Sequence, residues 1–326
     1  MGKSLKWLAV INPVSGRSMA KKKWEKKIKH QLESIINCEE YCTTGPGNAI
    51  DYVSQEIHHY DGFIAVGGDG TINEVVNGIV KGLNEQPSKT KVFAIIPAGT
   101  GNDIARAFDL PYKNIKASCD LFKNENSTYR LVDVGKASGF DFDNEPVTRY
   151  FCGVLSSGFD AEVTQKTHQS SKFLPGTANY IRSLLSNIIR LSRHHFSVSI
   201  LNNEKEEKFE KEGILMAVGL GPYYGAGMKI CPDAKVDDGL FHITFVNRVS
   251  RRTLLRVFPK VYDGKHITHP AIELYTGSEL SFQGSAKTIW QVDGEILGYT
   301  PVTIETLSNV LKILSPKQLE HKKSTK

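Results

Sequence analysis

Long hydrophobic runs and cysteine motifs are both missing from this sequence of 326 residues. No apolar stretch approaches the ~20 residues that a membrane-spanning helix needs. The N-terminal segment MGKSLKWLAVINP has too short an apolar run for a secretory signal. The five cysteines are scattered and form no C-x-x-C motif, which favours a reducing compartment. We therefore expect a cytoplasmic protein.

Positive charge is only slightly in excess, because the formal net charge is +6. The basic residues nevertheless gather in two segments. These are Lys21, Lys22, Lys23, Lys26, Lys27 and Lys29 in the first, and Arg248, Arg251, Arg252, Arg256 and Lys260 in the second. Neither segment has the interleaved aromatic residues that stack bases, so nucleic acid is not an expected partner. The clusters predict either a solvated helix face or contact with an anionic lipid surface.

The first third of the chain alternates strand and helix patterns. Strands are predicted at 6–11, 38–44, 62–66 and 91–97, and helices at 17–36, 48–59, 71–83, 102–108 and 113–123. This order predicts a doubly wound α/β domain over residues 1–134, with a parallel sheet covered by helices on both faces. Such sheets bind ligands in the loops at the carboxyl ends of their strands.

The pattern of apolar and turn residues changes after the segment RLVDVG at 130–135. Short strand patterns separated by turn residues follow, which predicts a mostly antiparallel β domain over residues 135–306. Two helices interrupt it, at 177–192 and around 250–263. Residues 307–326 contain one more strand pattern, VLKIL at 310–314, and a polar tail.

Four loops of the first domain are rich in glycine and small polar residues. They are NPVSG at 12–16, TTGPGN at 43–48, GGDGTIN at 67–73 and PAGTGND at 97–103, each following a predicted strand. Glycine lets backbone N–H groups approach a phosphate closely, and a helix N-terminus adds positive potential. A tight turn would explain one such loop. Four on the same edge of one sheet predict a polyphosphate site.

A Walker A sequence is absent, so no P-loop lysine is available to neutralise a nucleotide. Backbone dipoles and Mg²⁺ held by a carboxylate would have to do so instead. Asp69 and Asp103 are the carboxylates on this edge. Either could alternatively be a helix N-cap. For Asp69 we favour the metal or catalytic role, because GGDG is more constrained than a cap requires.

Several motifs together carry a family resemblance. GGDGTINE, with NPVSG upstream and PAGTGND downstream, resembles the diacylglycerol kinase catalytic family, and most closely its soluble bacterial-type lipid kinases. The later blocks YYGAGMKICPDAKVDDGLF at 223–241 and VDGE at 292–295 are similar to family blocks in the same order. The resemblance covers residues 6–316. It implies an N-terminal domain like those of NAD kinase and phosphofructokinase, a C-terminal antiparallel β-sandwich, an active site between them, and a strand at 310–314 that returns to the first domain.

The resemblance also implies roles for individual residues. Positions matching those that bind ATP are Asn12, Pro13, Val14, Ser15, Gly16, Thr43, Gly67, Gly68, Asp69, Gly70, Thr71, Ile72, Asn73 and Thr100. Glu295 matches the proton acceptor. Lys235, Asp238 and Leu240 match a Mg²⁺ site, with Asp69, Asp103 and Asp238 in a hydrated magnesium network. Without the resemblance, Asp293-Gly294 would be interpreted as a hairpin turn with Glu295 merely exposed.

These observations predict an ATP- and Mg²⁺-dependent lipid kinase, bound peripherally to an anionic membrane and converting diacylglycerol to phosphatidic acid. Another lipid, such as a sphingoid base or a phosphatidylglycerol-type lipid, remains an alternative acceptor. A kinase of a soluble molecule such as NAD is disfavoured, because nothing like the TPxGSTAY segment of those enzymes is present. A non-catalytic nucleotide-binding regulator is disfavoured because Glu295 and all four loops are intact. For the oligomeric state, a homodimer is left open as an alternative to a monomer.

Overall fold

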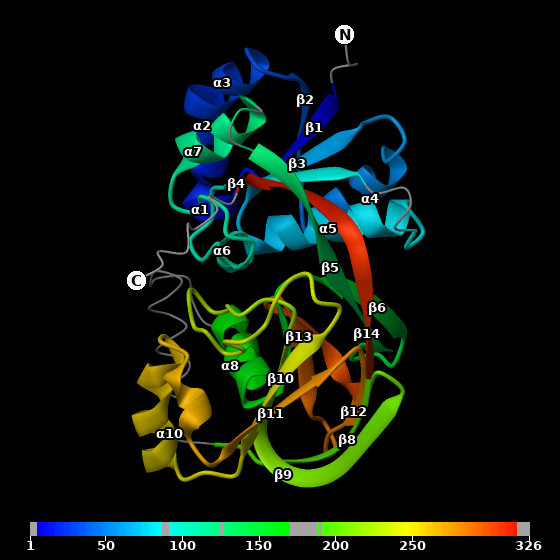
Figure 1. Ribbon diagram of the computed structural model, residues 1–326, viewed down its shortest axis with the longest axis vertical. Coiled ribbons are helices and arrows are strands. Elements are labelled where there is room, and N and C mark those ends of the chain that lie inside the picture. The colour runs from blue at the N-terminus through cyan, green and yellow to red at the C-terminus, as the bar shows by residue number, and fades with distance from the viewer. Residues whose placement is uncertain are drawn as a thin grey trace, which may run out of the picture.

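Two lobes lie one above the other and are joined by two long strands, β5 (Ser127–Phe140) and β14 (Glu295–Pro316) (Figure 1). The computed structural model describes residues 5–86, 91–123, 125, 127–169, 188 and 191–317. β5 and β14 pair antiparallel along most of their length. The boundary expected at residue 134 falls inside β5, and the domain limits remain a prediction.

The N-terminal lobe contains the predicted parallel sheet. Its strands are β1 (Lys6–Ile11), β2 (Asn37–Cys42), β3 (Gly62–Gly67) and β4 (Val92–Pro97), in the order β2-β1-β3-β4. The end of β14 adds a parallel strand beside β4, with Lys312 opposite Val92. β3 and β4 are buried along their whole length, which is why they appear as continuous apolar runs.

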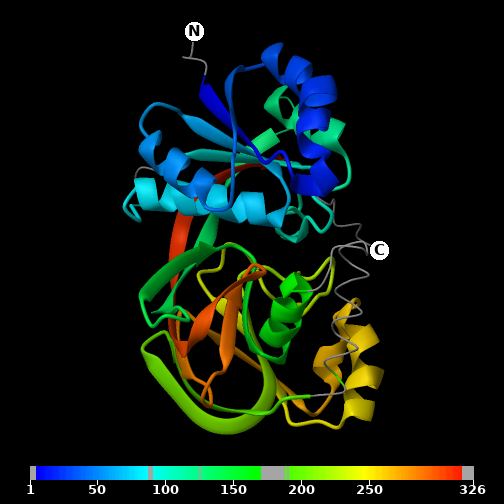
Figure 2. The ribbon, with the colours of Figure 1, turned by 180° about the vertical axis from the view of Figure 1, so that it is seen from behind.

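Helices cover both faces of this sheet (Figures 1 and 2). α4 (Asn48–Gln55) and α5 (Asp69–Gly82) lie on one face. The other face carries α7 (Ile115–Asp120) and the N-terminal helical segment, while the short α6 (Asp103–Ala107) follows β4. The helix expected at 17–36 is divided into α1 (Ser15–Ser18), α2 (Ala20–Lys23), a π-helical turn at Trp24–Ile28 and α3 (Lys29–Glu33). Its apolar stripe is nevertheless as predicted, because Trp24, Ile28 and Leu32 are buried.

The C-terminal lobe is antiparallel, as predicted. Its strands are β6 (Pro146–Phe151), β7 (Val154–Gly158), β8 (His194–Asn202), β9 (Lys205–Gly219), β10 (Phe241–Asn247), β11 (Ile272–Gly277), β12 (Glu279–Gln283) and β13 (Ile289–Val292). The pairings β9-β7-β13-β14-β12-β8-β9 close a ring around a core that includes Phe196, Phe245 and Trp290.

Two helices of this lobe, α8 (Phe159–Gln169) and α10 (Arg251–Val257), contribute to one hydrophobic cluster that includes Phe159, Val163 and Leu254. α10 and the 3₁₀ turn Phe258–Val261 form the helix expected around 250–263. α8 was not predicted, because its sequence lacks a regular apolar stripe. The helix expected at 177–192 lies almost entirely outside the described residues. Within the described ranges, no helix combines the length and apolar character that crossing a membrane requires.

Candidate active site between the lobes

The four glycine-rich loops meet at one edge of the parallel sheet, as its strand order requires. The residues expected to bind ATP follow β1 (12–16), β2 (43) and β4 (100), or run from the end of β3 into the first turn of α5 (67–73). Neighbouring loops contact each other, since the Oγ atoms of Ser15 and Thr71 are 3.2 Å apart. The structure therefore brings all the predicted nucleotide-binding residues together at one edge.

Glycine is required where three of these loops pack backbone against backbone. A Cβ atom at Gly16, which has a φ of +58°, would lie 2.1 Å from the carbonyl oxygen of Ala98. A Cβ at Gly99 would lie 2.4 Å from the Cα of Gly68. No side chain separates these loops, and no side-chain cap occupies the N-terminus of α5, the end of a helix that favours anionic ligands.

Asp69 and Asp103 stand on adjacent loops of this edge. Asp69 does not cap its own helix, because Oδ1 accepts the N–H of Ile104 in α6 at 3.0 Å. Asp103 is buried, and its Oδ2 accepts the N–H of Ala226 at 2.6 Å. Burial raises the pKa of Asp69. Burial, and then the charge of Asp69, raises the pKa of Asp103 to about 6.

Asp293 is a third carboxylate at the site, and sequence reasoning missed it. Asp293 and Gly294 have φ values of +47° and +88° and form the two-residue turn between β13 and β14. The carboxylate points inward, where it accepts the N–H of Val154 at 2.9 Å and a hydrogen bond from Asn73 Nδ2 at 2.9 Å. Burial raises its pKa to about 6. A turn dipeptide gives no signal about the side to which its aspartate points.

A cavity of about 220 Å³ lies between the lobes, and Asp69, Asp103 and Asp293 all line it. Tyr223 and Tyr224 contribute aromatic surface to the same cavity. Acidic groups from the N-terminal lobe thus face groups of the C-terminal lobe across one space, which is an arrangement suited to joining two substrates.

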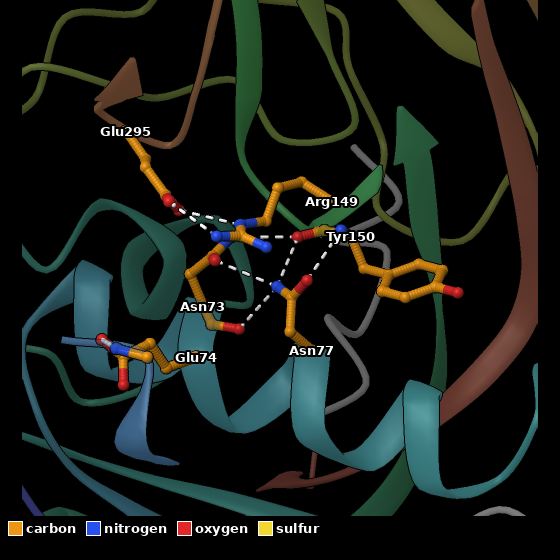
Figure 3. A network of polar contacts seen from close by, with 7 residues as sticks. Asn73, Glu74, Asn77, Arg149, Tyr150 and Glu295 are labelled. Atoms are coloured by element: carbon orange, nitrogen blue, oxygen red, sulfur yellow. Dashed lines mark hydrogen bonds and ion pairs between the residues drawn. The ribbon is translucent and has the colours of Figure 1, made fainter. Parts of the chain in front are cut away.

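Glu295 lies just outside this cavity, at the start of β14. It is exposed, and its two carboxylate oxygens accept hydrogen bonds from Arg149 in β6, at 2.9 and 3.1 Å (Figure 3). The hairpin interpretation of Asp293-Gly294 is therefore correct for the backbone. The role of Glu295 as proton acceptor remains a prediction that this turn neither requires nor prevents.

The loop that carries Lys235, Asp238 and Leu240 has different neighbours. Asp238 Oδ1 accepts the N–H of Leu240 at 3.1 Å, and its Oδ2 lies 3.1 Å from His242 Nε2. The loop is attached to β5, because Asp133 accepts the N–H of Gly239 at 2.7 Å. Asp69 and Asp103 are thus brought together at the cavity, whereas Asp238 is not among its lining residues.

Asp69 and Asp103 fit a hydrated divalent cation. Within the described part of the chain, no three His, Cys, Asp or Glu side chains are grouped closely enough to hold a metal alone. The buried Oδ1 of Asp103 makes no hydrogen bond among the described residues, although Arg106 Nη1 is 3.1 Å away. The Oδ2 atoms of both aspartates flank Gly101, and a cation would offset the repulsion between the two carboxylates. Such a pair suits Mg²⁺, which usually keeps several waters and takes further ligands from substrate phosphates.

The fold and the site define a two-lobed protein, with glycine-rich loops on one lobe and an antiparallel β lobe opposite, across a cavity lined by carboxylates. Residues 6–137 match the family model of the diacylglycerol kinase catalytic domain, and residues 153–315 match that of the YegS C-terminal NAD kinase beta sandwich-like domain. The chain belongs to the diacylglycerol kinase family and is a kinase.

Similar proteins cover the chain almost from end to end. A diacylglycerol kinase of Staphylococcus haemolyticus is 28% identical over 318 residues, which are 97% of this chain and 90% of that protein. One from Staphylococcus saprophyticus is 28% identical over 96% of both chains. The crystal structure of a diacylglycerol kinase from Bacillus anthracis has a TM-score of 0.67 at 22% identity, covering 97% of this chain and 99% of that one. The last comparison supports the fold.

The raised pKa of Asp103 predicts a measurable pH dependence of stability in the absence of divalent cations. The pKa rises from 3.8 to about 6, so between these values the folded protein binds more protons than the unfolded chain. The contribution of Asp103 to stability is therefore full below pH 4 and is lost as the pH rises through 6. Relative to Asp103→Asn, the free energy of unfolding of the wild type should fall by roughly 2 kcal/mol over this window. Urea titrations with a chelator measure this difference, and a constant difference would contradict the prediction.

Proposed function

We propose that this protein transfers the γ-phosphoryl group of ATP to the free hydroxyl of diacylglycerol, producing phosphatidic acid and ADP, with Mg²⁺ as cofactor. The observation that carries the proposal is the meeting of the glycine-rich loops with Asp69 and Asp103 beside a cavity between the lobes. The lipid acceptor is supported by the family and by the relatives that are named diacylglycerol kinase.

The reaction requires positioning and charge neutralisation more than covalent help. Backbone N–H groups at the start of α5 would hold the phosphates, and Asp69 and Asp103 would hold Mg²⁺, which neutralises the charge on the phosphates. The acceptor oxygen forms a bond to the γ-phosphorus as the bond from that phosphorus to the bridging oxygen of ADP breaks. Glu295 receives the proton of the hydroxyl.

The proposed activity is tested with labelled ATP and mixed micelles. The micelles carry diacylglycerol, a sphingoid base or phosphatidylglycerol, and soluble NAD is offered in parallel. We expect label in the lipid fraction from diacylglycerol micelles, dependent on Mg²⁺. Label in another lipid would change the acceptor and keep the lipid kinase. Phosphorylation of NAD alone would overturn the proposal.

We further propose that the lipid is reached through the α10 surface, defined as Arg248, Arg251, Arg252, Arg256, Lys260, Leu255 and Tyr262. All seven side chains are exposed, including the apolar Leu255 and Tyr262. The surface ends beside the loop that lines the cavity, because Val261 accepts the N–H of Lys229 at 2.9 Å and Tyr224 of the same loop lines the cavity. Basic and apolar groups side by side are the combination that binds anionic membrane surfaces.

Charge reduction on the α10 surface should weaken vesicle binding. Each basic residue near an anionic surface contributes about 1 kcal/mol, so Arg252→Gln with Arg256→Gln should lower binding to phosphatidylglycerol-containing vesicles by roughly 10- to 30-fold. The matched control is Lys22→Gln with Lys26→Gln, which removes two exposed charges from the N-terminal lobe. Sedimentation at increasing salt measures the effect. Equal loss in both double variants, or salt-independent binding, would contradict this surface assignment.

A further inference from the structure

Arg149 holds Glu295 by two hydrogen bonds, and both oxygens of the carboxylate are used. Nη2 donates to Oε1 at 2.9 Å and Nε donates to Oε2 at 3.1 Å (Figure 3). Such a two-point contact fixes the carboxylate in both position and direction. The guanidinium then occupies one lone pair on each oxygen, and a substrate hydroxyl can reach the carboxylate only from the side that faces away from Arg149.

The backbone next to Arg149 is fixed to the helix of the nucleotide loop. Asn77 of α5 accepts the N–H of Tyr150 at 2.9 Å and donates to its carbonyl oxygen at 2.7 Å. Asn73 donates to the same carbonyl at 3.1 Å. Both asparagines are buried, and α5 begins with the GGDG loop. The position of Arg149 is therefore set by the element that also presents the predicted phosphate site.

Arg149 is surrounded by acidic groups and remains accessible. Its pKa is raised first by the hydrogen bonds to Glu295, and the charge of Glu74 adds to this. Glu74 in turn accepts the N–H groups of Gly47, in the loop after β2, and of Ala49, in the first turn of α4. The side chain of Arg149 is 27% exposed and that of Glu295 is 47% exposed. An ion pair this open to water is weak enough to exchange partners.

Arg106, which lies next to Asp103 of the cavity, already has a charged partner and two aromatic neighbours. Arg106 pairs with Asp103 at 3.1 Å, and its guanidinium lies 4.7 Å from the ring centre of Tyr112 and 5.2 Å from that of Tyr223. Among the described residues, no aromatic ring encloses Arg149, and its planar guanidinium matches the geometry of phosphate as well as that of carboxylate.

We propose that Arg149 exchanges partners during the reaction, leaving Glu295 to bind the γ-phosphate of ATP. This inference rests on the proposed function and adds a nucleotide-controlled release of the proton acceptor. Before ATP binds, Arg149 occupies one lone pair on each Glu295 oxygen and fixes the direction of the carboxylate, which limits its approach to the hydroxyl of the lipid. Once the γ-phosphate takes the guanidinium, Glu295 is free to accept that proton as the new O–P bond forms and ADP leaves with its bridging oxygen.

Calorimetry with ADP and with the β,γ-imido analogue of ATP tests the exchange without turnover. Arg149→Gln should weaken the imido analogue about 10- to 100-fold, the range for loss of a charge-assisted contact, and ADP by less than about 3-fold. Glu295→Ala releases Arg149, so it should tighten the imido analogue by a few-fold and leave ADP unchanged. Arg149→Lys keeps the positive charge but loses the planar pair of N–H donors. Its affinity for the imido analogue should therefore lie between those of the wild type and of Arg149→Gln.

The matched control is Lys211→Gln, which removes the cation of the Lys211–Glu273 pair on the distant β9 and β11 strands and should leave both affinities unchanged. Equal effects of Arg149→Gln on both nucleotides, or no effect on either, would overturn the exchange. Weaker binding of the imido analogue by Glu295→Ala would also overturn it. If the proposed function itself is wrong, the result is different. The wild type would then fail to bind either nucleotide, or it would phosphorylate no lipid.

Discussion

Glu295→Gln should lower the turnover of diacylglycerol by ~10²-fold or more, the contribution expected of a positioned proton acceptor. The amide keeps the shape of the side chain but cannot accept the proton. Glu295 is exposed and pairs with one arginine, so the change in stability should be less than about 1 kcal/mol. The affinity for ATP should not weaken, because the glycine-rich loops of the other lobe are untouched. Initial rates over a range of ATP concentrations separate turnover from affinity.

Glu305→Gln is the matched control for this prediction. Glu305 lies on the same strand, β14, is exposed, and also pairs with one basic residue, Lys136, at 3.0 Å. This variant should turn over lipid at the rate of the wild type. If Glu295→Gln also remains within a few-fold of the wild type, Glu295 is not the proton acceptor. Asp69, Asp103 and Asp293, which line the cavity, would then be the carboxylates to examine.

Gly68→Val should reduce the affinity for ATP by about 10- to 100-fold, the range expected when charge-assisted hydrogen bonds from the backbone to phosphate are lost. A Cβ at Gly68 would lie 3.2 Å from the Cα of Gly99, and the two methyl groups of valine extend further. The loops at 67–73 and 97–103 must therefore separate, which moves the N–H groups at the start of α5. The φ of Gly68 is −101°, so valine itself introduces no left-handed strain.

A graded series distinguishes loop displacement from unfolding. Gly68→Ala places only the Cβ and should have a smaller effect than Gly68→Val. Ser281→Val introduces the same side chain on the exposed face of β12 and should leave nucleotide affinity unchanged. Melting temperatures show whether each variant is folded. A folded Gly68→Val protein with wild-type affinity for ATP in calorimetry would show that this loop does not bind phosphate.

The parallel sheet and its loop edge could be predicted because their signals are local. Strands buried on both faces appear as unbroken apolar runs, and glycine-rich loops directly follow them. Parallel order then brings the loops at 12–16 and 67–73 to the same edge without any further information. The four strands were accordingly predicted to within two residues at each end.

The remaining parts of the site depend on contacts between distant segments. Arg149 lies in a strand of mixed polarity, and its partner Glu295 is 146 residues away. The inward direction of Asp293 follows from the register of β13 on β7, where Val292 is opposite Leu155. α8 could not be recognised because it buries Asp160 beside apolar residues. Pattern reasoning on one segment cannot supply a register or a long-range partner.

The course of β14 also constrains the order in which the chain can fold during synthesis. Residues 312 and 313 pair with β4, so the N-terminal sheet lacks this neighbour until these two residues have left the ribosome. Until then, β4 presents an open strand edge, which is a surface for unwanted pairing with other chains. Termination before residue 312 would leave that edge open permanently. The N-terminal lobe is synthesised first, but its sheet is therefore the last part of the fold to be completed.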